Sequence, residues 1–229
     1  MKKISIIIPI YNEKDTLLQI LERVEKAPVW GLEKEILLID DGSTDGTKKI
    51  LKELESKYKI VYHKRNLGKG AAIRNGFKEA SGDIIIIQDA DLEYNPQDYP
   101  QLIRPILHGK ADVVYGSRYS KKDTSFYKSH YWGVKLISWL TSLLYGSNLT
   151  DVYTCYKVFK SPVIKSINLR SNGFEIEQEM TSKLLNRKCK IVEVPITYCP
   201  RTFEEGKKIN KWSNGLKAIW LIIKHRIIL

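Results

Sequence analysis

The amino-acid sequence predicts one α/β domain over residues 1–229, Rossmann-like, with a mostly parallel central sheet and helices on both faces. Strand-like and helix-like segments alternate through the first half of the chain, which is the pattern of a parallel sheet. Polar residues follow three of the expected strands, where open α/β sheets bind their ligands. The length of 229 residues suits one sizeable core and is short for two ordinary domains.

The first half is expected to contain four strands. Short apolar runs rich in isoleucine are typical of strands buried on both faces. Between these runs apolar residues recur at helical spacing, as with Leu17, Leu21 and Val24. The expected strands are residues 4–10, 35–39, 60–62 and 84–87. One expected helix begins near residue 17, and two others cover residues 47–58 and 71–80.

The second half is less regular. Pro195 places the last expected strand at a sheet edge, because proline donates no backbone hydrogen bond. A C-terminal amphipathic helix is expected where apolar, aromatic and basic residues mix. The expected elements are strands at 113–115 and 191–198, an apolar alternation at 151–159, helices at 131–145, 174–185 and 216–229, and charged loops at 120–129 and 201–211.

The net charge of +12 lies entirely in the second half of the chain. Residues 1–109 carry 17 basic and 17 acidic side chains, whereas residues 110–229 carry 21 basic and 9 acidic ones. Four of the five tryptophans lie in the second half as well. The second half is therefore expected to face an anionic partner at an apolar boundary.

Several classes of protein are excluded by composition. Three cysteines without Cys-x-x-Cys spacing argue against a disulfide framework and a thiolate zinc site, and they favour a reducing compartment. No apolar run reaches the roughly 20 residues of a membrane helix. The run at residues 4–10 contains Ser5 and Pro9 and lacks a cleavage site, so we interpret it as a strand and not as a signal peptide.

The segment Asp89-Ala90-Asp91 carries the sharpest chemical signal. An expected strand of four isoleucines ends at these two carboxylates, and Glu93 adds a third. Mg²⁺ and Mn²⁺ prefer oxygen ligands and commonly bridge a few carboxylates to the phosphates of a ligand. The pattern predicts a divalent metal site; helix capping by solvated acids is the alternative.

Two further loops follow expected strands. Residues 40–43, Asp-Asp-Gly-Ser, are interpreted as a loop whose carboxylate holds a ribose or a base, with an ordinary turn as the alternative. A Ca²⁺ loop is rejected because Lys52 stands where a bidentate glutamate is required. Residues 66–70, Asn-Leu-Gly-Lys-Gly, lack the spacing of a P-loop, so they either let backbone approach a nucleotide or form a plain turn.

Basic side chains gather in two segments of the second half. Such clusters are expected to clamp phosphate groups, and solvated surface charge is the alternative. The first cluster is Arg118, Lys121, Lys122 and Lys128, and the second is Arg201, Lys207, Lys208 and Lys211.

Taken in order, these motifs resemble the family 2 glycosyltransferases. The motifs that carry the resemblance are residues 9–13 (Pro-Ile-Tyr-Asn-Glu), 40–43, 66–70, 89–91 and 116–118 (Gly-Ser-Arg). Residues 151–157, 173–177, 194–196 and 201–208 look like the branch that makes dolichyl- and polyprenyl-phosphate sugars. The resemblance covers nearly the whole chain, and the ordered set is more specific than any single motif.

The resemblance implies a GT-A fold and an inverting transfer of a hexose from GDP-mannose or UDP-glucose to a polyprenyl or dolichyl phosphate. Residues 1–109 would form the nucleotide-sugar-binding half, and residues 110–229 the basic half that faces acceptor and membrane. Mg²⁺ or Mn²⁺ is the implied cofactor, with Asp89, Asp91 and Glu93 as ligands; glutamine often stands at the last position in relatives. The implied donor-binding residues are Pro9, Tyr11, Glu13, Ile39, Asp41, Asp89, Ala90, Asp91, Arg201 and Lys208.

The resemblance also implies that Arg118 binds the acceptor phosphate, with Lys128 and Lys135 as further basic residues of that region. A phosphate acceptor is ionised near neutral pH, since its second pKa is about 6, and it needs no strong general base. If the acceptor is instead a saccharide hydroxyl in a surface polymer, a carboxylate must take the proton, and Asp151 is the candidate. The predicted catalytic residues are Asp89, Asp91, Arg118 and Asp151.

The helices expected at residues 131–145 and 216–229 combine aromatic, apolar and basic side chains, as in helices that lie at a membrane interface. Packing onto the core is the alternative. The chain is expected to be a peripheral protein on the cytoplasmic, inner face of the cell membrane. Whether it also binds a separate membrane protein is left open by the sequence.

Two rival classes make different predictions. A nucleic-acid-binding protein, suggested by the basic half, needs a basic groove with exposed aromatic residues and has no need for Asp89 and Asp91. A catalytically inactive nucleotide-sugar-binding module binds the donor without turnover. The resemblance favours an enzyme without a nucleic-acid partner.

Overall fold

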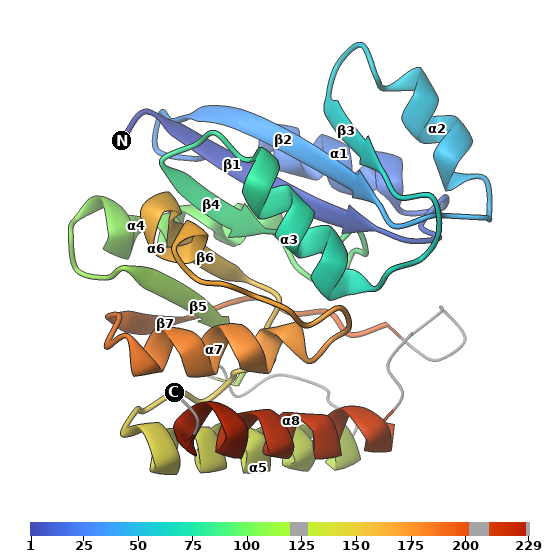
Figure 1. The fold of residues 1–229 in the computed structure, drawn as a ribbon. Coiled ribbons are helices and arrows are strands. Elements are labelled where there is room, and N and C mark those ends of the chain that lie inside the picture. Colours follow the sequence, from blue (N-terminus) through green and yellow to red (C-terminus); the bar gives the residue numbers. More distant parts are fainter. Residues whose placement is uncertain (120–127, 202–210, 228–229) are drawn as a thin grey trace.

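The computed structural model describes residues 1–119, 128–201 and 211–227, except for the side chains of residues 128–130 and 211–216. Its centre is a seven-stranded sheet in the order β3-β2-β1-β4-β6-β5-β7 (Figure 1). The strands are β1 (Lys3–Ile10), β2 (Glu33–Asp40), β3 (Lys59–Tyr62), β4 (Ile84–Ile87), β5 (Val113–Ser117), β6 (Lys157–Lys160) and β7 (Ile191–Pro195).

Helices flank the sheet, and α8 packs against α5 and α7 away from it (Figure 1). The C-terminal helix that the sequence predicts is therefore present. The helices are α1 (Leu17–Lys26), α2 (Thr47–Glu53), α3 (Lys69–Glu79), α4 (Tyr99–Leu107), α5 (Lys128–Tyr145), α6 (Ser161–Lys165), α7 (Ile176–Asn186) and α8 (Lys211–Ile227), with a 3₁₀ turn η1 (Pro96–Asp98) before α4.

The described strands run in one direction apart from β6. Strand β1 pairs in parallel with β2 and β4, β2 with β3, and β5 with β7, whereas β6 is antiparallel to β4 and β5. The prediction of a mostly parallel α/β sheet is confirmed. The carboxyl ends of the parallel strands meet at one edge, which is where such sheets bind ligands.

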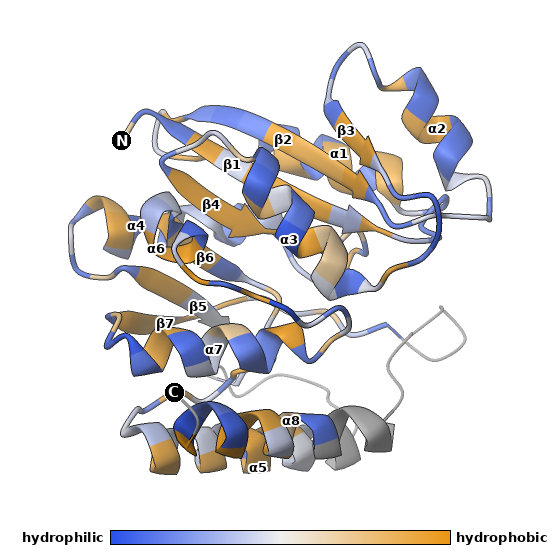
Figure 2. Cartoon of the chain, viewed as in Figure 1, coloured by the Kyte–Doolittle hydropathy of each residue, from blue (hydrophilic) through white to orange (hydrophobic). Residues whose placement is uncertain are grey.

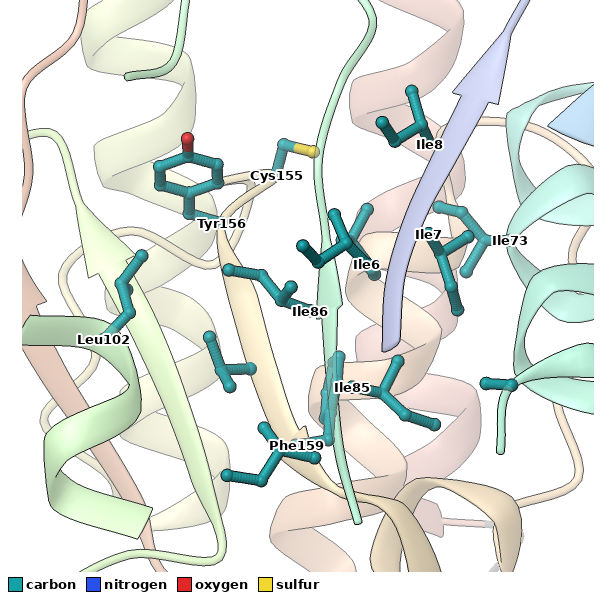
Figure 3. Packing of buried hydrophobic residues seen from close by; sticks show 14 of the residues in the cluster. Ile6, Ile7, Ile8, Ile73, Ile85, Ile86, Leu102, Cys155, Tyr156 and Phe159 are labelled. Atoms are coloured by element: carbon teal, nitrogen blue, oxygen red, sulfur yellow. The ribbon is translucent and has the colours of Figure 1, made fainter. Parts of the chain in front are cut away.

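The core explains why β1 and β4 lack the alternation of polar and apolar residues. Ile6, Ile7 and Ile8 of β1 are fully buried although successive side chains point to opposite faces, because packing covers both faces of this central strand. Figure 3 shows Ile7 beside Ile73 of α3 and Ile6 on the side of Ile86. Figure 2 shows the same strands as hydrophobic along most of their length.

The structure adds two helices to the expected elements, shortens one helix, and ends the strand expected at residues 191–198 at Pro195. Helices α4 and α6 are absent from the expected elements; α4 contains Pro100 in its first turn, where proline is tolerated, and Pro105 near its end. Helix α2 ends at Glu53 instead of continuing to residue 58, because Lys57 and Tyr58 lie in a turn and bond to Glu25. Strand β7 lies at the sheet edge, as Pro195 predicts. Residues 120–127 and 202–210 of the expected loops lie outside the described residues.

Candidate active site

The carboxyl edge of the sheet brings together many of the residues predicted for a site. The segments after β1, β2, β4, β5 and β7 begin there, and the segment before the antiparallel β6 ends there. The titratable residues in the segments at this edge include Glu13, Asp40, Asp41, Asp89, Asp91, Glu93, Arg118, Asp151, Cys155, Tyr198 and Arg201.

Arg201 links the segment after β7 to the carboxylates of the donor half. Its guanidinium donates to Asp91 Oδ2 at 2.9 Å and to Glu13 Oε2 at 3.2 Å. Its backbone N–H donates to Glu93 Oε1 at 2.8 Å, and the hydroxyl of Tyr198 donates to Glu93 Oε2 at 2.8 Å. The structure thus places Arg201 among the predicted acidic residues; Lys208, predicted beside it, lies outside the described residues.

Asp89 is paired with Lys69, which begins helix α3. The ammonium of Lys69 lies 2.7 Å from Asp89 Oδ1. Burial opposes the ionisation of Asp89, but the charges of Lys69 and Arg201 and hydrogen bonds from Lys69 and Cys155 overcome it and lower the pKa of Asp89. Burial and the Asp89 charge together raise the pKa of the Cys155 thiol, so Cys155 is a neutral neighbour of this carboxylate.

Asp91 has the opposite electrostatic environment. Burial, together with repulsion from Asp89 and Glu93, raises the pKa of Asp91 to about 7, although Arg201 acts against the shift. The two neighbouring carboxylates therefore differ in proton affinity, because Lys69 favours the ionised form of Asp89, whereas burial, Asp89 and Glu93 disfavour the ionised form of Asp91. Such divergence is typical of functional sites.

The acidic residues fit a divalent cation that is also held by phosphates. Within the part of the chain that the structure describes, no three His, Cys, Asp or Glu side chains are arranged to hold a metal ion. Asp89 and Asp91 nevertheless supply two oxygen-donor side chains whose mutual repulsion a cation would relieve. Mg²⁺ sites at phosphates commonly use only one or two carboxylates. Glu93 is instead engaged by Tyr198 and Arg201.

Asp41 is used to fix the loop before α3. Asp41 Oδ1 accepts a hydrogen bond from the N–H of Leu67 at 2.8 Å and faces His63 Nδ1 at 2.7 Å, while Oδ2 accepts from the N–H of Gly68 at 2.8 Å. His63 Nε2 in turn lies 2.7 Å from the amide nitrogen of Asn75. No sequence pattern marks His63 as a member of this network, because its partners are brought to it by the loop and by α3.

The glycines of residues 66–70 serve close packing between two loops. A Cβ at Gly68 would lie 2.3 Å from the carbonyl oxygen of Asn172, and one at Gly70 would lie 2.4 Å from that of Ser171. The N–H of Ala71 also donates to the carbonyl of Asn172 at 3.2 Å. The described structure therefore supports a packing role for these glycines.

Replacing Gly70 with alanine is expected to lower the free energy of unfolding by about 1–3 kcal/mol, because backbone atoms that cannot yield lie within 3 Å of the new methyl group. Gly133 in α5 is the matched control, since nothing lies within 4 Å of its Cβ position. Gly133→Ala should stabilise the fold by about 0.5–1 kcal/mol. Urea unfolding monitored by circular dichroism measures both; equal changes would contradict the packing role.

Arg118 and Asp151 form a buried, bidentate ion pair. The guanidinium donates to the two oxygens of Asp151 at 2.7 and 2.8 Å, and the backbone N–H of Arg118 donates to the same carboxylate at 3.2 Å. Arg118 is 4% exposed and Asp151 is 0% exposed. Glu193 holds the Asp151 segment by accepting from the N–H groups of Thr150 and Asp151. In this geometry Asp151 orients Arg118, and a role as a base would require the pair to separate.

Aromatic rings connect Arg118 to its surroundings. The guanidinium lies over the rings of Tyr119 and Tyr198, 5.6 and 5.1 Å from their centroids. The ammonium of Lys135 lies 4.8 Å from the centroid of the same Tyr119 ring. Two of the predicted acceptor residues, Arg118 and Lys135, therefore share one aromatic neighbour, whereas the side chain of Lys128 is not among those described.

The remaining predicted donor residues lie in or beside the core. Ile39 is fully buried in β2 and pairs with Pro9 of β1, and Ala90 is 3% exposed. Tyr11 follows β1 and is partly exposed. Pro9 and Tyr11 are therefore the partly exposed members of this group, whereas Ile39 and Ala90 are buried in the core.

Helices α5 and α8 carry an exposed apolar surface, here called the apolar face. On α5 the exposed apolar residues recur at intervals of three and four positions, which places them on one side of the helix. On α8, Lys224 lies 4.3 Å from the ring centroid of Trp220. None of the described helices is long and apolar enough to cross a membrane. The apolar face consists of Trp132, Leu136, Trp139, Leu143, Trp220, Ile223 and Ile227.

Solved structures with the same fold include glucosyl-3-phosphoglycerate synthase from Mycobacterium tuberculosis, in complex with Mn²⁺, uridine diphosphate and phosphoglyceric acid. That structure superposes with a TM-score of 0.73 and 19% sequence identity, over 99% of this chain and 79% of the other. At this identity the likeness concerns the fold, which is that of the GT-A glycosyltransferases.

Curated relatives are more similar in sequence. A dolichol-phosphate mannosyltransferase of Pyrococcus furiosus is 35% identical over 218 residues, which is 90% of this chain and 59% of the relative. An undecaprenyl-phosphate 4-deoxy-4-formamido-L-arabinose transferase of Salmonella paratyphi B is 32% identical over 212 residues, 90% of this chain and 63% of the relative. The chain thus spans about three fifths of the length of these relatives.

The family of the chain follows from the match to a family model. The model described as glycosyl transferase family 2 matches residues 5–167, which include most of β1, the whole of β2 to β6 and the acidic segment after β4. The order of the motifs, the sheet and this match agree, and the chain belongs to glycosyl transferase family 2.

Proposed function

We propose that this chain transfers a hexose from a nucleotide-sugar to a polyprenyl phosphate at a membrane surface. The observation that carries the proposal is the position of the buried guanidinium of Arg118 at the same carboxyl edge as the carboxylates of Asp91 and Glu93. Tyr198 connects the two, because its ring lies under Arg118 and its hydroxyl donates to Glu93. The curated relatives, whose names specify dolichol and undecaprenyl phosphate, support the choice of acceptor.

On the donor side, Asp89 and Asp91 would hold Mg²⁺ or Mn²⁺ together with the diphosphate. When bound, the cation supplies Lewis-acid stabilisation of the leaving nucleoside diphosphate. Arg201, already placed between Glu13 and Asp91, adds a positive charge that offsets the negative charge of the leaving group. GDP-mannose and UDP-glucose are the two donors to be tested.

On the acceptor side, Arg118 would orient the phosphate of the lipid. Asp151 holds the guanidinium in one orientation, which reduces the motion that must be lost when the phosphate binds. A phosphate oxygen carries negative charge near neutral pH, since the second pKa is about 6. The nucleophile therefore needs no proton acceptor, and Asp151 can stay paired with Arg118.

The apolar face supports contact with the membrane that contains such a lipid. Its tryptophans and aliphatic residues lie beside Lys217, Lys224 and Arg226 of α8, which suits an anionic lipid surface. The three cysteines are free, which suits a reducing compartment and hence the inner face of the membrane.

A transfer assay tests the proposed reaction. GDP-mannose and UDP-glucose, each labelled in the sugar, are incubated with the chain, Mn²⁺ and a short polyprenyl phosphate, and label in the organic phase is counted. Label from one donor is expected, and none with the unphosphorylated polyprenol as the matched acceptor. Nucleotide release without lipid product would point to a saccharide acceptor and contradict the proposal.

Membrane contact predicts the behaviour of a triple variant. Replacing Trp132, Trp139 and Trp220 with serine is expected to weaken binding to vesicles of anionic phospholipid by on the order of a hundredfold or more, since each buried aromatic contributes about 1.5–3 kcal/mol. Trp30→Ser is the control, because Trp30 is 56% exposed but lies outside the two helices. Unchanged cosedimentation of the triple variant would place the membrane surface elsewhere.

A further inference from the structure

Lys69 lies between two carboxylates that belong to different halves of the chain. Its ammonium is 2.7 Å from Asp89 Oδ1 and 3.8 Å from Glu177 Oε1 of helix α7. Phe174 also contacts this ammonium, with its ring centroid 5.9 Å away. Only the nearer carboxylate is within hydrogen-bond distance, so Lys69 is bonded to Asp89 and faces Glu177.

The two oxygens of Glu177 are used unequally. Oε2 accepts a hydrogen bond from Lys157, which is fully buried and also donates to the carbonyls of Val152 and Thr154. Oε1 is buried and has no hydrogen-bond partner among the described residues. An unsatisfied buried carboxylate oxygen is costly, and here it points to a donor that reaches it in another state of the site.

The backbone around Lys69 is fixed, whereas its side chain can move. The flanking Gly68 and Gly70 pack against the carbonyls of Asn172 and Ser171, which sets the start of α3 relative to the segment before α7. The four-carbon stem of a lysine is flexible. A shift of about 1 Å would bring the ammonium within hydrogen-bond distance of Glu177 Oε1.

We propose that Lys69 is the counter-cation of Asp89 that a divalent metal ion displaces, and that Glu177 Oε1 receives the displaced ammonium. Metal and lysine compete for the same carboxylate oxygen, because two cations cannot share it without strong repulsion. Glu177 is then a positioning residue that acts through Lys69. The inference rests on the metal dependence of the proposed function.

The test is binding of Mn²⁺ alone, without donor or acceptor, measured as free Mn²⁺ by electron paramagnetic resonance. Lys69→Met should tighten Mn²⁺ binding by about tenfold, since the substitution removes a positive charge next to the carboxylate of Asp89. Glu177→Gln should weaken it by about tenfold in the chain with Lys69 and by less than about twofold in the Lys69→Met background. Lys160→Met and Glu25→Gln, which break the ion pairs Lys160–Asp112 and Lys57–Glu25, are the controls.

Three results overturn the inference. Weaker Mn²⁺ binding by Lys69→Met would show that Lys69 holds Asp89 in position for the metal and does not compete with the metal. An equal effect of Glu177→Gln in both backgrounds would show that Glu177 acts by its charge alone. A wild-type chain without Mn²⁺ binding would also overturn it, yet sugar transfer by that chain would leave the proposed reaction standing. The sign of the Lys69→Met effect decides even if Glu177→Gln does not fold.

Discussion

Replacing Asp151 with asparagine is expected to lower the free energy of unfolding by about 3–5 kcal/mol, because it leaves the guanidinium of Arg118 buried without a counter-charge. Arg118 remains protonated at any pH at which the protein is folded. The carboxylate accepts two hydrogen bonds from the guanidinium and one from the backbone of Arg118. An asparagine amide would turn one of these acceptors into a donor.

The double variant Arg118→Met, Asp151→Asn separates the cost of an unpaired charge from that of lost packing. With the charge removed, most of the stability should return, while polyprenyl-phosphate-dependent transfer should stay lost if Arg118 orients the acceptor. Asp112→Asn is the matched control: its pair with Lys160 spans 2.8 Å but is partly exposed, so its loss should cost at most about 1 kcal/mol. Urea unfolding of the four proteins is the measurement; equal losses in Asp151→Asn and Asp112→Asn would contradict the burial argument.

The same pair shows how far sequence can predict the site. Asp89, Asp91 and Glu13 closely follow parallel strands, so the rule that ligands bind at carboxyl edges is enough to predict that they share one edge. For Arg118 and Asp151 the sequence predicts separate roles, one at the acceptor phosphate and one as a base. Their pairing depends on β6 running antiparallel, which returns the segment before it to the same edge. Alternation of residue types does not encode the direction of a strand.

Contacts between the halves of the chain are beyond sequence reasoning for a related reason. Glu177 is one of three glutamates on a helix that the sequence predicts to be amphipathic, and an acid on such a helix is usually exposed. It is buried because α7 packs toward α3 and meets both Lys157 and Lys69. Likewise, the glycines near Lys69 resemble a nucleotide loop, yet the atoms they accommodate belong to residues 171–172. Such pairings follow from packing, which local patterns do not specify.

Replacing Asp91 with asparagine is expected to reduce sugar transfer by about a hundredfold or more, because it removes a carboxylate proposed to hold the cation that stabilises the leaving group. In metal-free buffer, the same substitution should stabilise the fold. Burial, Asp89 and Glu93 raise the pKa of Asp91 to about 7, from an ordinary value of 3.8. Ionised Asp91 therefore destabilises the wild-type fold, whereas asparagine cannot ionise.

The sign of the pH dependence follows from these two pKa values. Below about pH 4 Asp91 is protonated in both folded and unfolded chains, and the variant has no advantage. Between pH 4 and pH 7 the unfolded chain releases the proton first, so the advantage of Asp91→Asn grows, and above pH 7 it should be constant at about 4 kcal/mol.

Asp112→Asn provides a control of opposite sign, because hydrogen bonds from Lys160 and the backbone of Lys190 lower the pKa of Asp112. That variant should lose stability at neutral pH, and the loss should disappear as the pH falls through the ordinary range of an aspartate. Unfolding in urea from about pH 2 to pH 8 with a chelator present measures both, because the loss in Asp112→Asn disappears only below the ordinary pKa of an aspartate. If Asp91→Asn instead loses stability at neutral pH, as Asp112→Asn should, then the attraction of Arg201 outweighs the repulsion from the surrounding carboxylates. Asp91 would then be ionised and paired with Arg201 before any metal binds.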